Sequence, residues 1–218
     1  MISLNCITKS LARKTIFDDV SLTIETGAHV AITGPSGCGK TTFLRLIAGL
    51  DTPDRGDIRI ESKLTSQSGR TLVPPHQRQV GFVFQAPALW PHMNVAQNIL
   101  FGLQQLPKSD AAERLNRILS ETGTTHLAKR MPDTLSGGEQ RCVAIARTLA
   151  PEPRILLMDE PLTNLDSVAK TELAELIKSI VNNSKMTLIY VTHDLKEVSH
   201  FCDRNYVIKN AKVIELNG

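Results

Sequence analysis

The sequence predicts an α/β fold built on a mostly parallel sheet. Three features lead to this prediction. Short apolar runs typical of buried strands recur along the chain, segments with helical spacing separate them, and one block in the middle shows helical spacing alone. Strands that alternate with helices form parallel sheets covered on both faces. A length of 218 residues suits one domain, or one domain with a small subdomain.

The first part of the chain is expected to contain most of the strands. Thr26-Gly27 marks a turn, and the apolar run that follows it, His29–Thr33, leads into a glycine. Residues 62–77 are rich in Ser, Gln, Gly and Pro and are therefore expected to form a loop. The expected elements are strands over 2–8, 17–24, 29–33, 56–60 and 79–84, and a helix over 40–50.

The second part of the chain changes to helices and then back to strands. Strand signals disappear between about 87 and 149, which predicts a helical insertion in the α/β framework. The helices expected in this block lie at about 94–104, 109–122 and 137–149. After it we expect strands over 155–158 and 187–192, a helix over 167–182, a short helix and a final hairpin near 206–216.

Composition and charge exclude several classes of protein. Lys and Arg number 25 and Asp and Glu 22, so the formal charge is +3, which favours neither a nucleic acid nor an anionic membrane as a partner. With 1 Trp, 2 Tyr and 6 Phe, a base-stacking surface is not expected. No apolar run approaches the roughly 20 residues of a membrane-spanning helix. The four cysteines form no close pair and no secretory signal is visible, so a reduced, cytosolic setting is expected.

The clearest motif is a glycine-rich loop between a predicted strand and a predicted helix. Residues 34–41 fit the pattern G-x-x-x-x-G-K-[ST], whose glycines let the backbone turn its N–H groups toward a phosphate. Lys40 can reach the β- and γ-phosphates, and Thr41 offers a hydroxyl to Mg²⁺. The alternative is a structural strand–helix turn with a surface lysine. The residues expected to bind a nucleotide are Gly34, Pro35, Ser36, Gly37, Cys38, Gly39, Lys40, Thr41 and Thr42.

Polar side chains follow two later strands of the predicted sheet. Asp159 and Glu160 end one apolar strand, at the edge where parallel sheets bind ligands. Asp159 can hold Mg²⁺, and Glu160 can orient and deprotonate an attacking water. His193 follows the next strand and can point at the same γ-phosphate. The alternatives are an acidic turn, a structural histidine, and a metal site with His200 and Cys202, whose spacing fits no common ligand pattern.

The segment at residues 135–140 leads into the helix predicted at about 137–149, and its sequence is Leu-Ser-Gly-Gly-Glu-Gln. Ser136 and Glu139 fit the S-x-x-E capping box, and the two glycines let a phosphate approach the backbone at the helix start. An ordinary helix cap is the alternative. With this segment the chain resembles the ATP-binding-cassette (ABC) ATPases.

The resemblance covers nearly the whole chain and includes six motifs in the family's order. They are similar to the Walker A loop (34–41), the Q-loop glutamine (Gln85), the signature motif (135–140), Walker B (155–160), the D-loop (Leu165-Asp166) and the switch histidine (His193). Six motifs in the right order are far more specific than any one of them.

The resemblance implies a fold and a dimer. The fold is an α/β P-loop NTPase, a mostly parallel sheet core with an N-terminal antiparallel β subdomain and an inserted helical subdomain. The core is expected at about 1–86 and 149–218 and the helical subdomain at about 87–148, without a C-terminal regulatory domain. Two subunits of the family pair head to tail, so ATP held by one copy's loop also meets residues of the other copy. Those residues are Ser136, Gly137, Gly138 and Glu139.

The resemblance also implies the chemistry, which is ATP hydrolysis with Mg²⁺. The implied catalytic residues are Glu160, His193 and Gln85, the implied Mg²⁺ ligands are Thr41, Gln85 and Asp159, and Asp166 belongs to the D-loop. One position departs from the family. Leu11 stands where an aromatic side chain that stacks on adenine is expected, and the nearest aromatic, Phe17, is expected in the core.

Segments 75–85 and 89–99 resemble importers for sugars, iron, polyamines, sulfate or thiamine. The implied partners are a second copy or a related ATPase subunit, transmembrane permease subunits and a solute-binding protein, with no nucleic acid. The implied location is the cytoplasmic face of the cell membrane, as a peripheral subunit, and the solute is set by other subunits. The alternatives are an ATPase of an export or lipoprotein-release system and a soluble ABC ATPase of DNA repair or translation. A small-molecule kinase or a GTPase does not explain residues 135–140.

Overall fold

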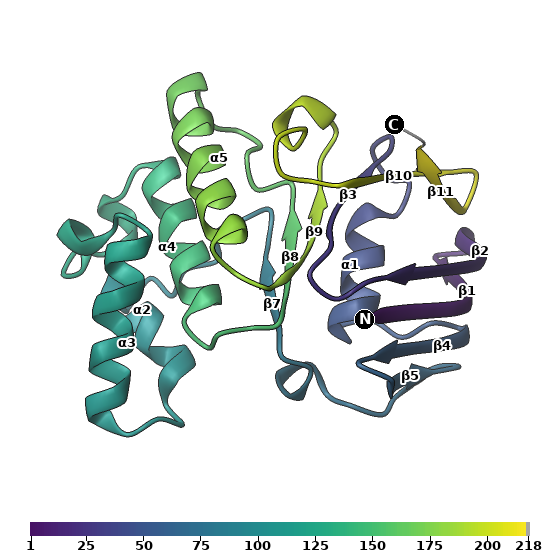
Figure 1. Ribbon diagram of the computed structural model, residues 1–218, viewed down its shortest axis with the longest axis horizontal. Helices are drawn as coiled ribbons and strands as arrows, with labels where there is room; N and C mark the ends of the chain where they lie inside the picture. The colour runs from purple at the N-terminus through teal and green to yellow at the C-terminus, as the bar shows by residue number, and fades with distance from the viewer. Residues whose placement is uncertain (217–218) are drawn as a thin grey trace. The chain divides into compact units, whose positions relative to one another are not determined.

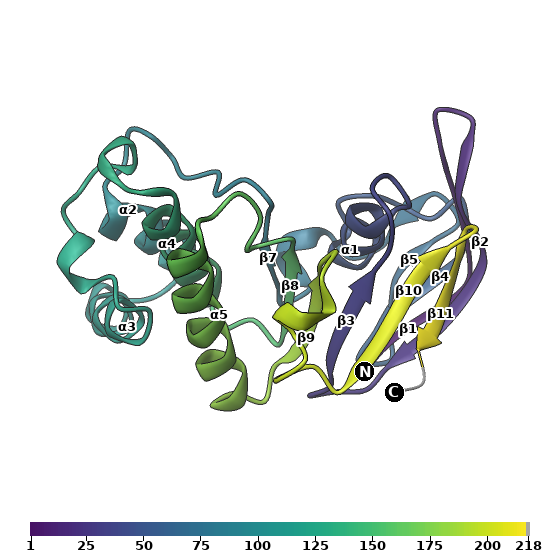
Figure 2. The ribbon, with the colours of Figure 1, turned by 90° about the horizontal axis from the view of Figure 1, so that it is seen from above.

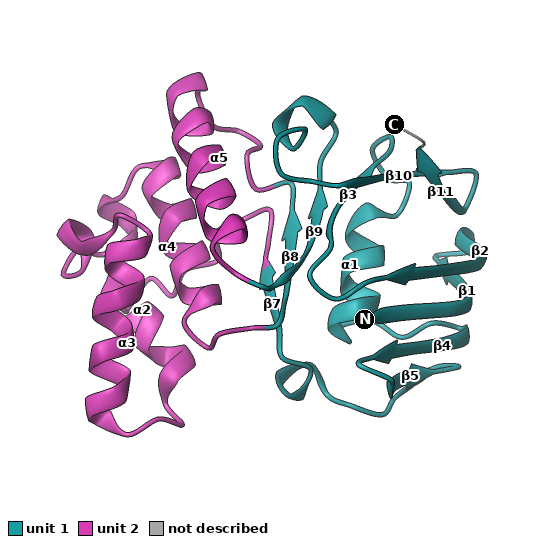
Figure 3. Ribbon diagram, viewed as in Figure 1, with its two compact units in different colours: residues 1–82, 154–160, 185–218 teal, residues 83–153, 161–184 magenta. Residues whose placement is uncertain are grey.

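The computed structural model describes residues 1–216 and contains two compact units, shown in different colours in Figure 3. The first unit comprises 1–82, 154–160 and the described part of 185–218. The second unit comprises 83–153 and 161–184 and holds most of the helices. The subdomain boundaries expected from the sequence stay a prediction.

The first unit contains an antiparallel sheet with the strand order β2-β1-β4-β5-β6. Its strands alternate buried and exposed side chains over much of their length, as expected for a sheet with one face on the core. The strands are β1 (Ile2–Leu11), β2 (Lys14–Ile24), β4 (Arg55–Ile60), β5 (Lys63–Gln67) and β6 (Arg70–Thr71). This sheet confirms the antiparallel β part of the predicted fold.

A second sheet has the strand order β11-β10-β3-β9-β8-β7. The pairs β10–β3, β3–β9 and β9–β8 are parallel, and β10–β11 is an antiparallel hairpin, so the prediction of a mostly parallel sheet is confirmed. The central strands β8 and β9 are buried along their whole length and consist mainly of aliphatic and β-branched residues, as in strands covered on both faces. The strands are β3 (His29–Thr33), β7 (Val80–Val83), β8 (Ile155–Asp159), β9 (Thr187–Val191), β10 (Arg204–Lys209) and β11 (Lys212–Leu216).

Helix α1 (Lys40–Ala48) shares one hydrophobic core with both sheets of this unit (Figures 1 and 2). Its apolar face is fully buried, and the ring of Phe43 meets the ring of Phe17 on β2 edge-on at 6.1 Å. Phe17 is therefore a core residue, as predicted. The helix ends at Gly49, whose φ of 78° is left-handed and whose N–H bonds back to the last turn. Burial on two sides fixes the direction of this helix, and with it the position of its N-terminus.

The prediction that residues 62–77 form a loop is wrong, because this segment contains β5, β6 and the 3₁₀ turn η1 (Pro75–Gln77). Two of its polar side chains, Thr65 and Ser66, are buried and hydrogen-bonded. Thr65 donates to the carbonyl of Ile58 (2.9 Å), and the hydroxyl of Ser66 accepts from Arg78 (2.7 Å). Composition alone indicates a solvated loop, whereas partners distant in the sequence make these polar groups part of a sheet.

Arg78 connects this segment to helix α1. Its guanidinium is buried and donates to carbonyl or hydroxyl oxygens only, among them those of Val73 (2.8 Å), Thr65 (3.0 Å) and Ile47 (2.9 Å). Burial lowers the pKa of Arg78 to about 10. A Cβ on Gly49 would lie 2.3 Å from the guanidinium carbon, so glycine is required there by space as well as by conformation.

The second unit is a group of helices around α4 (Gly137–Leu149). Helix α4 contacts α2 (Val95–Leu100), α3 (Lys108–Glu121) and α5 (Ser167–Asn182), which confirms the predicted block of helices (Figure 3). The helix expected over 94–104 is α2 followed by the tighter 3₁₀ turn η2 (Phe101–Leu103). Two further 3₁₀ turns are η3 (Thr125–Leu127) and η4 (Pro132–Thr134), and the short helix expected after β9 is the 3₁₀ turn η5 (Leu195–Glu197) of the first unit.

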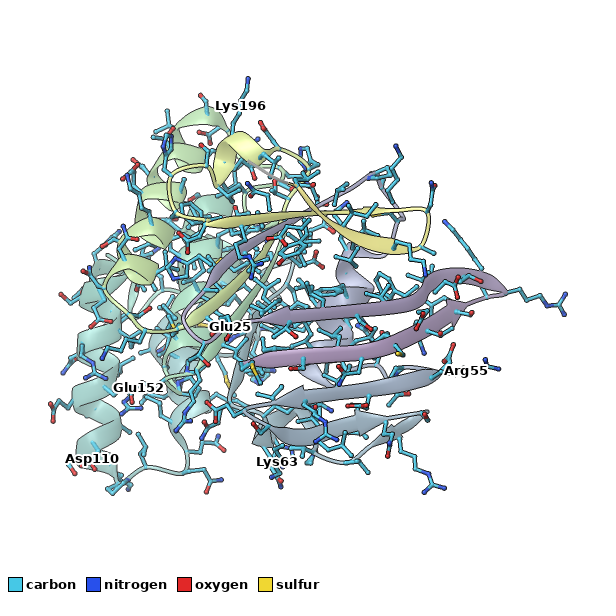
Figure 4. The ribbon with its side chains drawn as sticks, turned by 45° about the vertical axis from the view of Figure 1, so that its right-hand side comes forward. Glu25, Arg55, Lys63, Asp110, Glu152 and Lys196 are labelled. Carbon is cyan, nitrogen blue, oxygen red and sulfur yellow. The ribbon has the colours of Figure 1, made fainter. Side chains whose placement is uncertain are left out.

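Charged side chains of both signs lie at the surface of each unit. In the first unit Arg55 and Lys63 are exposed on the antiparallel sheet, and in the second unit Asp110 and Glu152 are exposed (Figure 4). Among residues 1–216, no helix is long and apolar enough to cross a membrane.

Candidate functional site

The glycine-rich loop joins β3 to α1, as the sequence predicts. Three of its glycines have a positive φ, namely Gly34 (149°), Gly37 (73°) and Gly39 (114°). A Cβ on Gly34 would lie 2.8 Å from the carbonyl oxygen of Ile208, and one on Gly39 would lie 2.4 Å from Ile16. The loop can therefore curl over the start of α1 only because it has no side chains at these points.

The side chain of Lys40 lies within this loop and is only 7% exposed. Its ammonium donates to the carbonyl of Gly34 (3.0 Å) and forms an ion pair with Glu160 at 3.3 Å. The N-cap residue of α1, Gly39, supplies no side-chain cap, so the first N–H groups of the helix have no side-chain acceptor there. A buried cation beside a helix N-terminus is an arrangement that binds phosphate.

Asp159 is the last residue of β8 and is buried, with 4% exposure. Burial raises its pKa, Glu160 raises it further, and a hydrogen bond from Thr41 together with the charge of Lys40 opposes the rise. The Thr41 hydroxyl and the Asp159 carboxylate are thus in contact, next to the phosphate loop. Both are hard oxygen ligands, which is the donor chemistry that Mg²⁺ prefers when phosphates and water complete its shell.

Glu160 and His193 meet because their strands are parallel neighbours. Asp159 is paired with Val191 in the register of β8 and β9, so the residues that follow the two strands lie at the same edge. The Glu160 N–H bonds to the Val191 carbonyl (3.0 Å), and its carboxylate lies 3.6 Å from His193 Nδ1. Glu160 has a φ of 45°, which aims it out of line with the strand. One carboxylate therefore contacts both Lys40 and the histidine.

The first unit accordingly brings five predicted site residues together: Lys40, Thr41, Asp159, Glu160 and His193. The alternative metal site with His200 and Cys202 gains no support, since residues 1–216 contain no group of three or more His, Cys, Asp or Glu side chains arranged to hold a metal. Leu11, at the end of β1, is 42% exposed, and nearby Lys14 donates to the Gly37 carbonyl of the loop (3.2 Å). The hairpin between β1 and β2 therefore reaches the phosphate loop.

The segment 135–140 forms the start of α4 in the second unit and makes the predicted capping box. The Ser136 hydroxyl accepts from the Glu139 N–H (3.2 Å), and the Glu139 carboxylate accepts from the Ser136 N–H (2.7 Å). That last bond is the main reason for a lowered pKa of Glu139. A Cβ on Gly138 would lie 3.2 Å from Ala169 of α5, so glycine lets the two helix starts approach closely.

Asp166 is the N-cap of α5 and accepts hydrogen bonds from the N–H groups of Val168 and Ala169, both at 3.0 Å. These bonds lower its pKa. Since Leu165 lies 3.7 Å from a Cβ built on Gly137, the D-loop segment and the start of α4 are neighbours. The structure thus places the predicted signature and D-loop residues side by side within the second unit.

Gln85 is exposed in the segment that follows β7. The residue that holds this segment was not found from the sequence. Arg141 is buried in α4 and donates to the carbonyl of Phe84 (3.0 Å) and to that of Thr163 (3.4 Å). It therefore ties the segment before Gln85 to the one that leads to Asp166. The only signal in the sequence is an arginine beside the apolar positions of α4.

A strand, a glycine loop and a helix that hold a buried lysine beside strand-end carboxylates define a P-loop nucleotide-binding domain. The ABC transporter family matches residues 17–163, so the chain belongs to that family, and the resemblance stated above is confirmed. ATP binding is a property of this family of ATPases.

Similar proteins include import subunits and solved cassettes. The chain is 41% identical over 218 residues to the spermidine/putrescine import ATP-binding protein PotA of Bacteroides thetaiotaomicron, covering 99% of this chain and 46% of that protein. It is 41% identical over 211 residues to the Fe(3+) ions import ATP-binding protein FbpC of Agrobacterium fabrum, covering 96% of this chain and 58% of that protein. The chain therefore spans only about half the length of these relatives.

Two solved structures match the fold over the full length of both chains. A dimeric structure of MJ0796, a bacterial ABC transporter cassette, has a TM-score of 0.86 at 30% identity. A dimeric post-hydrolysis state of the same cassette, bound to ADP and Pi, has a TM-score of 0.85 at 29% identity. The predicted P-loop NTPase fold is confirmed by these matches.

Proposed function

We propose that this chain is the ATP-hydrolysing subunit of an ABC importer and that it works as a head-to-tail dimer. The observation that carries the proposal is the contact of one carboxylate, Glu160, with both Lys40 (3.3 Å) and His193 (3.6 Å) at the mouth of the phosphate loop. A base, a cation and a histidine at one strand edge suit the attack of water on a γ-phosphate.

Within one copy, the loop N–H groups and Lys40 bind the β- and γ-phosphates. Glu160 accepts a proton from the attacking water, and His193, through its contact with Glu160, holds that carboxylate and the γ-phosphate in line. Thr41, Asp159 and Gln85 are the residues proposed to hold Mg²⁺, which would neutralise phosphate charge when bound. The contact of Thr41 with the buried Asp159 supports two of these three ligands.

The start of α4 is proposed to serve the other copy of the dimer. Ser136, Gly137, Gly138 and Glu139 form an exposed or half-buried helix N-terminus, and Asp166 caps the helix beside it. Such a terminus favours an anion, here the γ-phosphate of ATP bound to the partner copy. The dimeric cassettes of similar fold support a dimer, and closure of the dimer by ATP is the motion that a permease can use.

The proposal places the chain in a solute uptake system with transmembrane permease subunits and a solute-binding protein, at the cytoplasmic face of the membrane, and the names of the import relatives support the uptake part. Their names differ between polyamines and Fe(3+), so the proposal assigns no particular solute. Cross-linking in membranes followed by identification of the captured permease tests this part, and capture of ribosomes or DNA alone contradicts it.

The catalytic part is tested with Glu160→Gln, which keeps the shape of the side chain and removes the base. We expect at least about a 100-fold loss of ATP hydrolysis. We also expect a stable dimer when ATP is added, measured by analytical ultracentrifugation. Glu175→Gln, an exposed change on α5, is the matched control and should hydrolyse ATP normally. A Glu160→Gln protein that hydrolyses ATP at the normal rate contradicts the assignment of the base.

A further inference from the structure

Arg130 contacts the signature turn (residues 135–140) from the segment before it. Its Nη1 lies 3.3 Å from Glu139 Oε1, and its other amino group donates to the carbonyl of Thr134. The second carboxylate oxygen of Glu139 is used by the Ser136 N–H at 2.7 Å. The guanidinium therefore holds the loop before the helix and the first turn of the helix at once.

The turn carries a negative charge at a place where an anion is proposed to bind. The bond from the Ser136 N–H lowers the pKa of Glu139, so this side chain is ionised at neutral pH. The Glu139 N–H is occupied by the Ser136 hydroxyl, which leaves the N–H groups of Gly137 and Gly138 for a ligand. A carboxylate within one helical turn of these groups repels a phosphate unless a cation balances it.

This end of the helix is open on one side. A cavity of about 570 Å³ is lined by Ser136, Gly138 and Glu139, by residues 120–124, 126 and 127 and by residues of α5. Arg130 is not among its lining residues, so its cation approaches Glu139 from outside this cavity. Among the described residues, the charge of Arg130 is the larger of the two side-chain charges that lower the pKa of Glu139, the other being that of His126.

We propose that Arg130 is a positioning residue for ATP bound by the partner copy. It balances the charge of Glu139 and fixes the turn, so that Ser136, Gly137 and Gly138 can accept the γ-phosphate. The inference rests on the proposed dimer. If Arg130 had only a structural role, Arg130→Ala would have little effect. The reason is that an ion pair whose partners are 43% and 29% exposed stabilises a fold only weakly.

The test measures ATP-driven dimerisation in the Glu160→Gln protein, as the ATP concentration for half-maximal dimer in analytical ultracentrifugation. Adding Arg130→Ala should raise that concentration about three- to tenfold, more at low salt than at high salt. The ATP concentration for Arg130→Lys should lie between those of the parent and Arg130→Ala, since an ammonium keeps the charge but does not reproduce the planar guanidinium. ATP binding by the monomer, measured at high dilution, should be unchanged, because it depends on the phosphate loop.

A double-mutant cycle separates charge balance from general damage. Glutamine still completes a capping box, so Glu139→Gln removes the charge and keeps the turn. Arg130→Ala should then have little effect in the Glu139→Gln background. Arg117→Ala is the matched control, since Arg117 is an exposed arginine of the same unit that pairs with Glu121 and Glu152, outside residues 135–140. It should dimerise like the parent protein.

Three outcomes overturn the inference. Either Arg130→Ala leaves the half-maximal ATP concentration unchanged, or its effect is the same with and without Glu139. Thermal unfolding of each variant identifies a folding defect. If Arg130→Ala also weakens ATP binding by the monomer, and the loss of dimer is explained by that weaker binding, the inference is contradicted as well. If the Glu160→Gln parent forms no dimer at any ATP concentration, the proposed function itself fails, and the role of Arg130 fails with it.

Discussion

The starts of α1 and α4 are both helix N-termini built on glycines, yet they are completed in different ways. At α1 the N-cap is Gly39, no side chain caps the helix, and Lys40 and Asp159 beside it are buried. At α4 the N-cap is Ser136, and a complete capping box with Glu139 satisfies the turn. The first terminus is therefore left to be completed by a ligand, whereas the second is stable by itself and presents its groups outward.

The two helix starts therefore get their shape from different parts of the chain. The phosphate loop depends on the core of two sheets and on the absence of side chains at Gly34 and Gly39. The signature turn (residues 135–140) depends on local bonds and on the approach of α4 to α5 at Gly138. Changes at the loop should affect nucleotide binding and folding strongly, and changes at the turn should affect dimer formation.

The largest expected effect is a difference in ATP affinity between variants of two lysines at the phosphate loop, the buried Lys40 and the exposed Lys14. Lys40→Ala removes charge-assisted contacts to phosphate worth about 1.5–3 kcal/mol each, so ATP affinity should fall about 100-fold or more. Lys14→Ala removes an exposed contact with the Gly37 carbonyl and should change affinity less than about threefold. Titration with a fluorescent ATP analogue measures both. Equal losses in the two variants contradict the central role given to Lys40.

The next effect compares two glycines of the loop. Gly39→Ala places a Cβ 2.4 Å from Ile16 at a φ of 114°, and we expect it to lower the free energy of unfolding by about 2–4 kcal/mol. A Cβ on Gly37 would have no heavy atom within 4 Å, so the only cost of Gly37→Ala is its φ of 73°. We expect it to lower the free energy of unfolding by about 1 kcal/mol. Urea unfolding of both variants gives the difference. If the two cost the same, the core does not shape the loop as described.

A smaller effect concerns the buried carboxylate. Burial raises the pKa of Asp159 above its ordinary 3.8, so the ionised group destabilises the fold at neutral pH. Asp159→Asn should therefore raise the melting temperature at pH 7 while ATP hydrolysis is lost. The gain should be full above the raised pKa and should disappear as the pH falls toward 3.8. A melting temperature that is unchanged or lower at pH 7 contradicts this account of Asp159.

The smallest effect has the opposite sign and belongs to the signature turn. The pKa of Glu139 is lowered in the folded protein, so its ionised form stabilises the fold above the ordinary value of 4.5. Glu139→Gln should melt slightly lower than the parent at pH 7, and the gap should close as the pH falls through the lowered pKa. Melting curves from pH 3 to pH 7, a range chosen around these values, check it. A gap that widens at low pH contradicts the assigned hydrogen bond.

The two regions also differ in how far the sequence predicted them. The phosphate loop and the capping box were predicted residue by residue, because both depend on neighbours in the chain. The meeting of Glu160 with His193 followed from the expectation of parallel strands, which the register of β8 and β9 confirms. The proposed roles of these residues in hydrolysis stay predictions.

Other features could not be predicted because their partners are distant in the chain. β5 lies in the segment whose composition predicts a loop, because composition does not show the bond from Arg78 to Ser66. Arg141 was missed for the same reason, because its acceptors are backbone carbonyls of Phe84 and Thr163 that no pattern marks. The change from α2 to η2 after Leu100 was not predicted, although Gly102 lies within η2.

The most direct test of the central claim mixes two inactive variants. Lys40→Ala disables the phosphate loop of one copy, and Ser136→Asp keeps a helix cap while placing a negative charge against the γ-phosphate. In a head-to-tail dimer of one copy of each, both defects fall in one site and the other site is intact. Since half of the dimers in an equal mixture are mixed, ATP hydrolysis should return to about a quarter of the unmutated rate. A mixture no more active than either variant alone contradicts the account.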